Sequence, residues 1–193
     1  MKVGFTFRVL QAIGLNYSET EYGRITLFSI IRKVWITYRK AFLIKFFMNS
    51  FLFAPISSRK LRPWVLKKIG CKIGKNVFIG AQVYFDAGYS NLIIIEDHAH
   101  VTARCLLLCH QRDLSNYRVG DDAAKLGYKT GNIHIKKGAM IGMNTTIMPG
   151  VTIGEGAIIG AHSLVTKDIP AWTIATGVPA KVVKQVMERE SAN

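Results

Sequence analysis

The chain has 193 residues, of which 49% are apolar, a composition typical of a globular domain with a sizeable core and unlike that of a disordered chain. The formal net charge of +14 is unevenly spread, because residues 1–72 contain 14 Lys and Arg against two acids, whereas residues 73–193 contain 12 against 10. The three cysteines form no CxxC pair and no even set, which argues against a disulfide framework and favours a reducing compartment. Because Met1–Gly14 lacks a secretory signal pattern, we expect a cytoplasmic protein.

Residues 1–72 are predicted to form a basic amphipathic helical segment. Between Leu27 and Met48, apolar residues recur at steps of three or four and form one stripe of an α-helix. The stripe consists of Phe28, Ile31, Trp35, Tyr38, Phe42 and Phe46, and the other faces carry Arg32, Lys33, Arg39, Lys40 and Lys45. A second short helix is predicted for Trp64–Ile69, ending at Gly70. No uninterrupted apolar run reaches about 18 residues, so a membrane-spanning helix is not expected.

Two interpretations of this basic segment are compatible with one another. In the first, it packs as a helical cap on the end of the domain that follows. In the second, it makes a peripheral contact with an anionic membrane on the inner face of the cytoplasmic membrane, where each basic residue contributes about 1 kcal/mol. Binding to nucleic acid is not expected, because the basic residues come without zinc-ligand spacing or a recognition-helix signature.

Residues 73–185 are dominated by a repeat of six residues. Successive units from Ile135 each open with an aliphatic residue, and most carry a small or β-branched residue at the fifth place. The opening residues are Ile135, Ile141, Ile147, Ile153, Ile159 and Val165, and the fifth-place residues are Ala139, Thr145, Val151, Ala157 and Ser163. Further blocks begin at Ile73 and Ile95, with a shift of register between blocks.

This period has a direct structural meaning. A flat strand of about four residues and a bend of about two form one side of a triangular coil, and three sides close a coil of about 18 residues. The opening residue points into the prism, and the small fifth residue fits near the corner. Glycines at the second place allow close backbone approach or unusual dihedral angles, and these are Gly74, Gly80, Gly142, Gly154 and Gly160. The predicted fold class is all-β, a parallel β-helix over 73–185 with an N-terminal helical segment and a short tail at 186–193.

The repeats resemble the hexapeptide-repeat acyltransferases, whose domains are left-handed parallel β-helices, an exception to the usual right-handed crossover. The resemblance covers roughly residues 73–185. It is strongest in MPGVTIGEGAIIGAHSLVTKDIP and the following ATGVPAKVVK, which are similar to galactoside, maltose and xenobiotic acetyltransferases. Residues 1–72 are more weakly similar to enzymes that acetylate capsule or O-antigen sugars. The resemblance implies a homotrimer with active sites between adjacent prisms and acetyl-CoA as the acyl donor.

The six-residue period stops between Leu107 and Ile135, where residues 110–132 form a polar, glycine-containing excursion loop. A loop that interrupts a regular coil is a candidate site. His110 stands at the start of this loop, where the resembled family has its catalytic histidine. A neutral imidazole takes up a proton near neutral pH, so His110 is the predicted general base. Backbone N–H groups are expected to stabilise the oxyanion that forms.

Asp86, in the stretch VYFDAG, is predicted to contact the acceptor or to orient His110. The resembled sugar acetyltransferases often have asparagine at the matching place, and an aspartate cannot donate a hydrogen bond as an amide does. Tyr84 is a second candidate for acceptor binding, as a ring on which a sugar can stack. The other histidines are His98, His100, His134 and His162, which lack the spacing of a zinc site, so no metal is expected.

The resemblance assigns acetyl-CoA binding to the last coils. The matching residues are Met140, Gly142, Met143, Gly160, Ala161, Thr166 and Lys167, with Lys181 and Lys184 as the basic pair that meets the CoA phosphates. Many family members have tryptophan at the place of Met140. The alternative for the two lysines is the solvated face of a C-terminal helix.

Together these residues predict an acetyl-CoA-dependent O-acetyltransferase that acts on a sugar hydroxyl in surface polysaccharide biosynthesis, with a lipid-linked precursor as one candidate acceptor. Two alternatives stay open. One is an N-acetyltransferase acting on an amino sugar, which would use the same base and donor site. The other is a non-catalytic trimeric scaffold.

Overall fold

The chain divides into two compact units, Met1–Phe42 and Leu43–Asn193. The first unit contains helices α1 (Phe5–Ala12) and α3 (Leu27–Phe42), and no residue of α3 is buried. Within the described residues, none of the helices combines the length and the apolarity that a membrane crossing requires. The computed structural model describes residues 4–12, 25–48, 50–53 and 56–188, so residues 189–193 of the predicted tail lie outside the described residues.

The long helix predicted between residues 27 and 48 changes its geometry on the way. It is α-helical as far as Phe42 and continues as the π-helix η1 (Leu43–Met48) in the second unit. The wider π-helical turn ends with Met48 buried, whereas Phe46 stays 44% exposed. The predicted single α-helix therefore ends at Phe42, and the stripe residue Phe46 lies on the π-helix η1.

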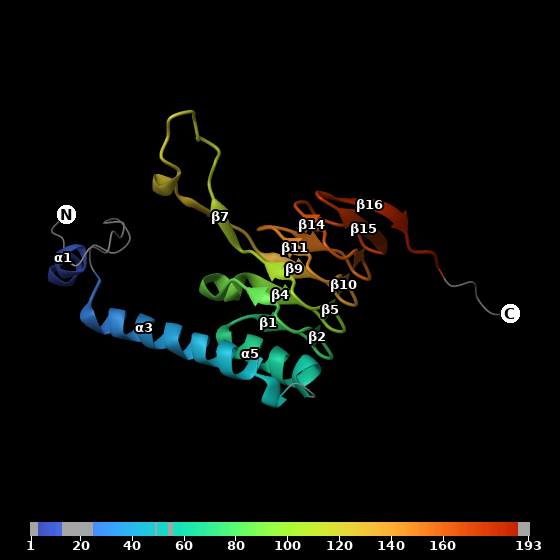
Figure 1. The fold of residues 1–193 in the computed structure, drawn as a ribbon, viewed down its shortest axis with the longest axis horizontal. Coiled ribbons are helices and arrows are strands. Elements are labelled where there is room, and N and C mark those ends of the chain that lie inside the picture. The colour runs from blue at the N-terminus through green and yellow to red at the C-terminus, as the bar shows by residue number, and fades with distance from the viewer. Residues whose placement is uncertain (1–3, 13–24, 49, 54–55, 189–193) are drawn as a thin grey trace. The chain divides into compact units, whose positions relative to one another are not determined.

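The second unit begins with helical turns that cover the first coil of a β-helix (Figure 1). In the last of these, Val65, Leu66 and Ile69 are buried in the same core as that coil, so the cap interpretation holds for this part of the basic segment. Gly70 ends the helix in the left-handed region, at φ 114°, as predicted. The turns are η1, η2 (Phe51–Phe53), η3 (Ser57–Leu61) and α5 (Arg62–Ile69).

The body is a left-handed parallel β-helix whose three faces are sheets of short strands (Figure 1). The strands are β1 (Lys72–Ile73), β2 (Phe78–Ile79), β3 (Tyr84–Phe85), β4 (Ile93–Ile95), β5 (His100–Val101), β6 (Leu106–Leu107), β9 (Ile133–Ile135), β10 (Met140–Ile141), β11 (Thr146–Ile147), β12 (Thr152–Ile153), β13 (Ile158–Ile159), β14 (Leu164–Val165), β15 (Thr173–Gly177) and β16 (Ala180–Gln185). Sheet 1 has the order β1-β4-β9-β12, sheet 2 the order β16-β15-β13-β10-β5-β2, and sheet 3 the order β14-β11-β6-β3. This arrangement confirms the predicted fold class.

The excursion loop leaves the prism as an antiparallel pair, β7 (His110–Arg112) with β8 (Tyr128–Thr130). Its far end contains the short turn η5 (Ala123–Lys125), and Figure 1 shows this hairpin projecting from the stack of coils. A second irregular turn, η4 (Ala87–Leu92), interrupts the preceding coil at the same corner. Two departures from the repeat therefore lie side by side.

Burial follows the six-residue period. The six opening residues from Ile135 to Val165 are at most 1% exposed, and the fifth-place residues between them are at most 2% exposed. At roughly 25 cal/mol per Å² of buried apolar surface, this continuous stack is the main stabilising term of the prism. The predicted inward direction of both positions is confirmed.

The glycines at the second place have one of their two predicted roles. A Cβ on Gly142 would lie 2.5 Å from the Ala161 nitrogen, and one on Gly160 would lie 2.6 Å from Thr176 Oγ1, so close approach explains them. The unusual dihedral angles belong instead to the fourth place, which turns each corner in the left-handed region. In the units from Ile135 onward, these residues, at φ between 57° and 87°, are Gly138, Asn144, Gly150, Gly156 and His162.

Candidate active site

Asp86 and His110 meet at one edge of the prism. Strands β3 and β6 pair in register in sheet 3, with Phe85 opposite Leu107, so the residues that follow them lie in adjacent coils. Asp86 follows β3 directly, and His110 comes three residues after β6. We call this edge, where the chain passes from sheet 3 to sheet 1 and the hairpin leaves the prism, the loop edge.

The carboxylate of Asp86 contacts the imidazole of His110 through Oδ2 and Nδ1. The same Oδ2 accepts a hydrogen bond from the Cys109 N–H at 3.3 Å. The Asp86 side chain is 8% exposed and that of His110 is 34% exposed, so a buried carboxylate stands behind a ring that opens to solvent. An Nδ1–H that donates to the carboxylate leaves Nε2 as the nitrogen that accepts a proton. The pair has the arrangement of a general base held by an orienting carboxylate.

Two tyrosine rings flank His110. Tyr89, from η4, has its ring centroid 5.0 Å away at an angle of 36°, and Tyr128, from β8, lies 5.2 Å away and closer to perpendicular, at 69°. Arg112 stands opposite Tyr128 in the hairpin and places its guanidinium 4.2 Å over that ring. Tyr84, predicted to bind the acceptor, is exposed on β3 one coil below β6, whereas Tyr89 and Tyr128 are the rings that lie beside His110.

The Cys109 thiol lies next to the base but is not activated by it. Burial, and secondly the charge of Asp86, raise the pKa of the Cys109 thiol to about 11. A thiol with this pKa is protonated at neutral pH and is a poor nucleophile. Cys109 is therefore a poor candidate for a nucleophile that forms a covalent intermediate.

The folded protein is expected to resist alkylation by iodoacetamide at about pH 8, because the Cys109 thiolate is scarce and all three cysteines are buried. Intact-mass spectrometry should show no adduct on the folded protein and adducts on all three cysteines in urea. Rapid labelling of Cys109 in the folded protein, located by peptide mapping, would contradict a protonated, inaccessible thiol.

The predicted donor-binding residues gather along a second edge, where the chain passes from sheet 2 to sheet 3, here called the glycine edge. Gly142 and Gly160 occupy the same corner of adjacent coils, each followed by an exposed residue, Met143 or Ala161. The Gly142 N–H donates to the Ile159 carbonyl at 2.8 Å. The absence of side chains on these two glycines leaves backbone close to the surface, as a ligand that hydrogen-bonds to amides needs.

The two lysines predicted to meet phosphate lie on a strand. The alternative of a C-terminal helix face is wrong, because β16 turns back antiparallel on β15 and places Lys181 opposite Thr176 and Lys184 opposite Ile174. A Cβ on Gly160 would touch Thr176, so Lys181 continues the line of the glycine edge. The chain reverses in the tight GVPA connection, which contains Pro179.

The remaining predicted donor contacts divide between the two edges. Met140 is 41% exposed on β10 and pairs with Ile158, on the outer face of sheet 2 beside the glycine edge. Thr166 and Lys167 are exposed and follow β14 at the loop edge, the same edge as His110. One chain therefore places His110 and most of the predicted donor-binding residues on different edges of its prism.

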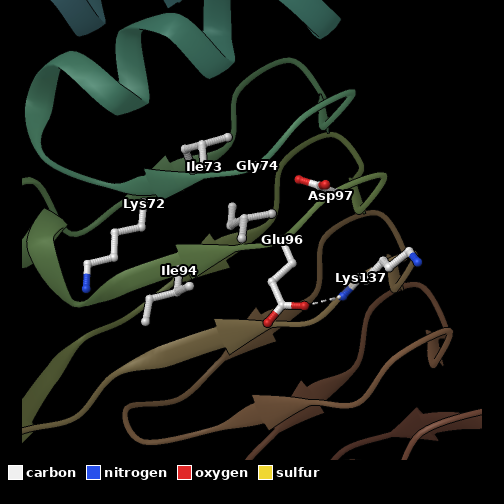
Figure 2. Close-up of a pocket in the computed structure, with 8 residues that line it drawn as sticks. Lys72, Ile73, Gly74, Ile94, Glu96, Asp97 and Lys137 are labelled. Atoms are coloured by element: carbon white, nitrogen blue, oxygen red, sulfur yellow. Dashed lines mark hydrogen bonds between the residues drawn. The ribbon is translucent and has the colours of Figure 1, made fainter.

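A second histidine–carboxylate pair is formed by His134 and Glu96, and Glu96 lines a hollow on sheet 1 (Figure 2). Glu96 Oε1 lies 2.6 Å from His134 Nε2, and Glu96 Oε2 accepts a hydrogen bond from the Lys137 N–H at 3.0 Å. Asp97 is likewise bonded to a backbone N–H, that of Lys75, at 2.6 Å. Both carboxylates accept hydrogen bonds from backbone N–H groups, so we assign them a structural role in stabilising the turns between strands. Across the described residues, no cluster of three or more His, Cys, Asp or Glu could hold a metal ion.

Comparison with known proteins gives the family. Residues 132–167 match the family model described as bacterial transferase hexapeptide (six repeats). The galactoside O-acetyltransferase of Escherichia coli K12 is 31% identical over 160 residues, covering 76% of this chain and 79% of that protein. The chain therefore belongs to the bacterial hexapeptide-repeat transferases, the family that contains this galactoside O-acetyltransferase.

Solved structures share the fold. A hexapeptide-repeat acetyltransferase from Vibrio cholerae O1 biovar eltor, complexed with acetyl-CoA, aligns with a TM-score of 0.65 at 21% identity, covering 89% of this chain and 100% of that one. A maltose O-acetyltransferase from Clostridium difficile 630 aligns with a TM-score of 0.61 at 22% identity, covering 80% and 88%. A relative from Staphylococcus aureus strain COL is 37% identical over 115 residues, and the chain spans only 55% of its length.

Proposed function

We propose that this protein is an acetyl-CoA-dependent O-acetyltransferase acting on a sugar hydroxyl. The observation that carries the proposal is the contact of the buried Asp86 carboxylate with the half-open ring of His110 at the loop edge. The named activity of the E. coli relative, which transfers acetyl to galactosides, supports the reaction class. The free cysteines favour a reducing compartment, so the proposed reaction takes place in the cytoplasm.

In the proposed reaction, His110 Nε2 removes the proton from the acceptor hydroxyl as the oxygen attacks the thioester carbonyl of acetyl-CoA. The new C–O bond produces a tetrahedral oxyanion, which backbone N–H groups stabilise. Collapse of this intermediate breaks the C–S bond and releases the CoA thiolate, which takes the proton back from the imidazolium. Asp86 keeps the ring oriented and balances its charge while it is protonated. Its low exposure supports this orienting role over direct acceptor binding.

The donor is proposed to lie along the glycine edge. The pantetheine arm carries amides that can pair with backbone near Gly142 and Gly160, and Met140 supplies an apolar contact. At the end of this line, Lys181 and Lys184 offer two positive charges to the CoA phosphates, and neither forms an ion pair in the described structure. The acceptor is proposed to bind at the loop edge among Tyr84, Tyr89 and Tyr128.

The separation of the two edges supports a homotrimer. A donor held on the glycine edge of one prism cannot reach His110 on another edge of the same prism across sheet 3. Side-by-side packing of prisms about a threefold axis brings the loop edge of one protomer to the glycine edge of its neighbour. Thr166 and Lys167, at the loop edge, would then contact the donor from the protomer that provides the base.

The Lys181→Glu, Lys184→Glu double variant is expected to bind acetyl-CoA at least about tenfold more weakly, because two charge-assisted contacts to phosphate become repulsive. Isothermal titration calorimetry measures this without knowledge of the acceptor. The matched control is Lys75→Glu with Lys136→Glu, which makes the same change of charge on exposed residues away from the glycine edge. Equal affinity of the two double variants would remove the lysine pair from the donor site.

The acceptor class is tested by release of CoA in the presence of a panel of galactosides, maltose and amino sugars. Turnover with hydroxyl acceptors supports the proposal, and turnover confined to the amino sugars would assign an N-acetyltransferase. A folded trimer that neither binds nor consumes acetyl-CoA would leave the scaffold as the function. A surface polysaccharide precursor, lipid-linked in the proposal, is identified by comparing glycan acetylation in cells with and without the protein.

A further inference from the structure

Helix α3 exposes a continuous apolar stripe. Seven of its large apolar side chains are between 48% and 75% exposed, although side chains of this size are usually buried. These residues are Leu27, Phe28, Ile31, Val34, Trp35, Tyr38 and Phe42. Their spacing of three and four residues places them on one side of a helix about 24 Å long. A patch of this kind marks an interaction surface.

The charges of α3 identify the kind of partner. Its sequence, LFSIIRKVWITYRKAF, contains four basic residues and no acid. Arg32 and Arg39 are seven residues apart, about two turns, so both lie along the same border of the apolar stripe. Aromatic rings bordered by arginine suit the interface of a membrane, where the rings enter the headgroup region and the guanidinium groups meet phosphate.

Other occupants fit this surface less well. A second copy of α3 would bring Arg32 and Arg39 against the same positive charges, with no acid on the helix to offset the repulsion. A membrane-spanning arrangement is not available to a helix of this length and polarity. A surface of anionic phospholipid matches both the apolar stripe and its basic border.

We propose that α3 binds the surface of membranes that contain anionic phospholipid, lying in the interface with its aromatic stripe in the headgroup region. This inference does not depend on the transfer reaction, which involves residues of the β-helix alone. If both hold, the membrane contact brings the enzyme to the surface at which lipid-linked sugars are found.

The binding is measured by co-sedimentation with vesicles of an equimolar mixture of phosphatidylcholine and phosphatidylglycerol, compared with vesicles of phosphatidylcholine alone. The protein is expected to sediment with the anionic vesicles and to be released as salt is raised. Of the three tryptophans, Trp64→Phe with Trp172→Phe leaves Trp35 alone, so its fluorescence reports α3 directly. A blue shift on addition of the anionic vesicles is the expected result.

Arg32→Glu with Arg39→Glu is expected to weaken vesicle binding at least about tenfold. Trp35→Ser with Tyr38→Ser is expected to weaken it by a similar factor through lost apolar contact. Lys75→Glu with Lys136→Glu, which makes the same change of charge on the β-helix, should bind vesicles as the parent does. No residue of α3 is buried, so the variants are expected to fold, and unchanged titration with acetyl-CoA checks this separately.

Three results would overturn the proposal. The first is failure of the parent to bind the anionic vesicles, and the second is equal binding to both kinds of vesicle. The third is an assembly larger than the proposed trimer in sedimentation velocity without lipid, if the Trp35→Ser, Tyr38→Ser variant does not form it. That result would assign the stripe to a second copy of the chain. Loss of acetyl-CoA binding with vesicle binding retained would instead count against the proposed function alone.

Discussion

Replacement of His110 by alanine is expected to lower the rate of acetyl transfer by about 10²–10⁴-fold, because the attacking hydroxyl loses the base that takes its proton. Binding of acetyl-CoA should change little, since most of the proposed donor-binding residues lie on the glycine edge and His110 lies on the loop edge. The measurement is CoA release under saturating donor with the best acceptor of the panel, together with calorimetry of the donor. A fall in kcat with the donor affinity retained is the expected pattern.

The matched control for this variant is His134→Ala, which also removes a histidine paired with a carboxylate, but on β9 of sheet 1. It should retain activity within about twofold, since Glu96 keeps its bond to the Lys137 N–H. If His110→Ala transfers acetyl as fast as this control, His110 is not the base and the loop edge loses its proposed role.

Asp86→Ala is expected to lower kcat by about 10²–10⁴-fold, because His110 Nδ1 loses its partner and the ring loses its fixed orientation. Asp86→Asn keeps an oxygen that accepts hydrogen bonds but removes the charge, so it should retain more activity than alanine does. Steady-state kinetics of both variants, with calorimetry of acetyl-CoA as the check on folding, give the measurement.

The two roles predicted for Asp86 have different kinetic signatures. An orienting carboxylate affects kcat and leaves the apparent affinity for the acceptor nearly unchanged. A carboxylate that holds an acceptor hydroxyl raises KM for the acceptor when it is removed. A change confined to KM in Asp86→Ala would therefore contradict the orienting role and assign Asp86 to acceptor binding.

The repeat allowed most of the fold to be predicted, because each position of the six-residue unit has one physical requirement. An aliphatic opening residue such as Ile141 must be buried, and a glycine such as Gly142 must allow the next coil to approach. The left-handed corners at the fourth place were not predicted, because Asn144 and His162 tolerate that conformation without being specific to it. The reversal into β16 was also missed, since the run from Ala180 to Gln185 has no strong strand pattern.

The candidate site was predicted only in part. His110 was found from the interrupted repeat, and its contact with Asp86 follows from the register of β3 and β6. The positions of Tyr128 and Arg112 depend on which residues of the hairpin pair with one another. Strand register can be predicted from sequence where one face is buried, and the polar loop has no such apolar face. The position of Tyr128 and Arg112 near His110 therefore becomes evident only in the folded structure.

The stacking of the coils fixes the distance, along the prism, between the two ends of the proposed donor site. His110 follows β6 in the second coil, whose sheet 2 strand is β5, and Lys181 lies on β16, four strand positions farther along sheet 2. At about 4.8 Å per strand, the proposed base His110 and the proposed phosphate-binding Lys181 differ by about 19 Å in height along the prism, and packing about a parallel threefold axis preserves that difference. Adding or removing one whole coil would change it by a single strand spacing while leaving every corner intact. The number of coils in a β-helix of this kind therefore sets the length of acyl donor that the proposed site can accommodate.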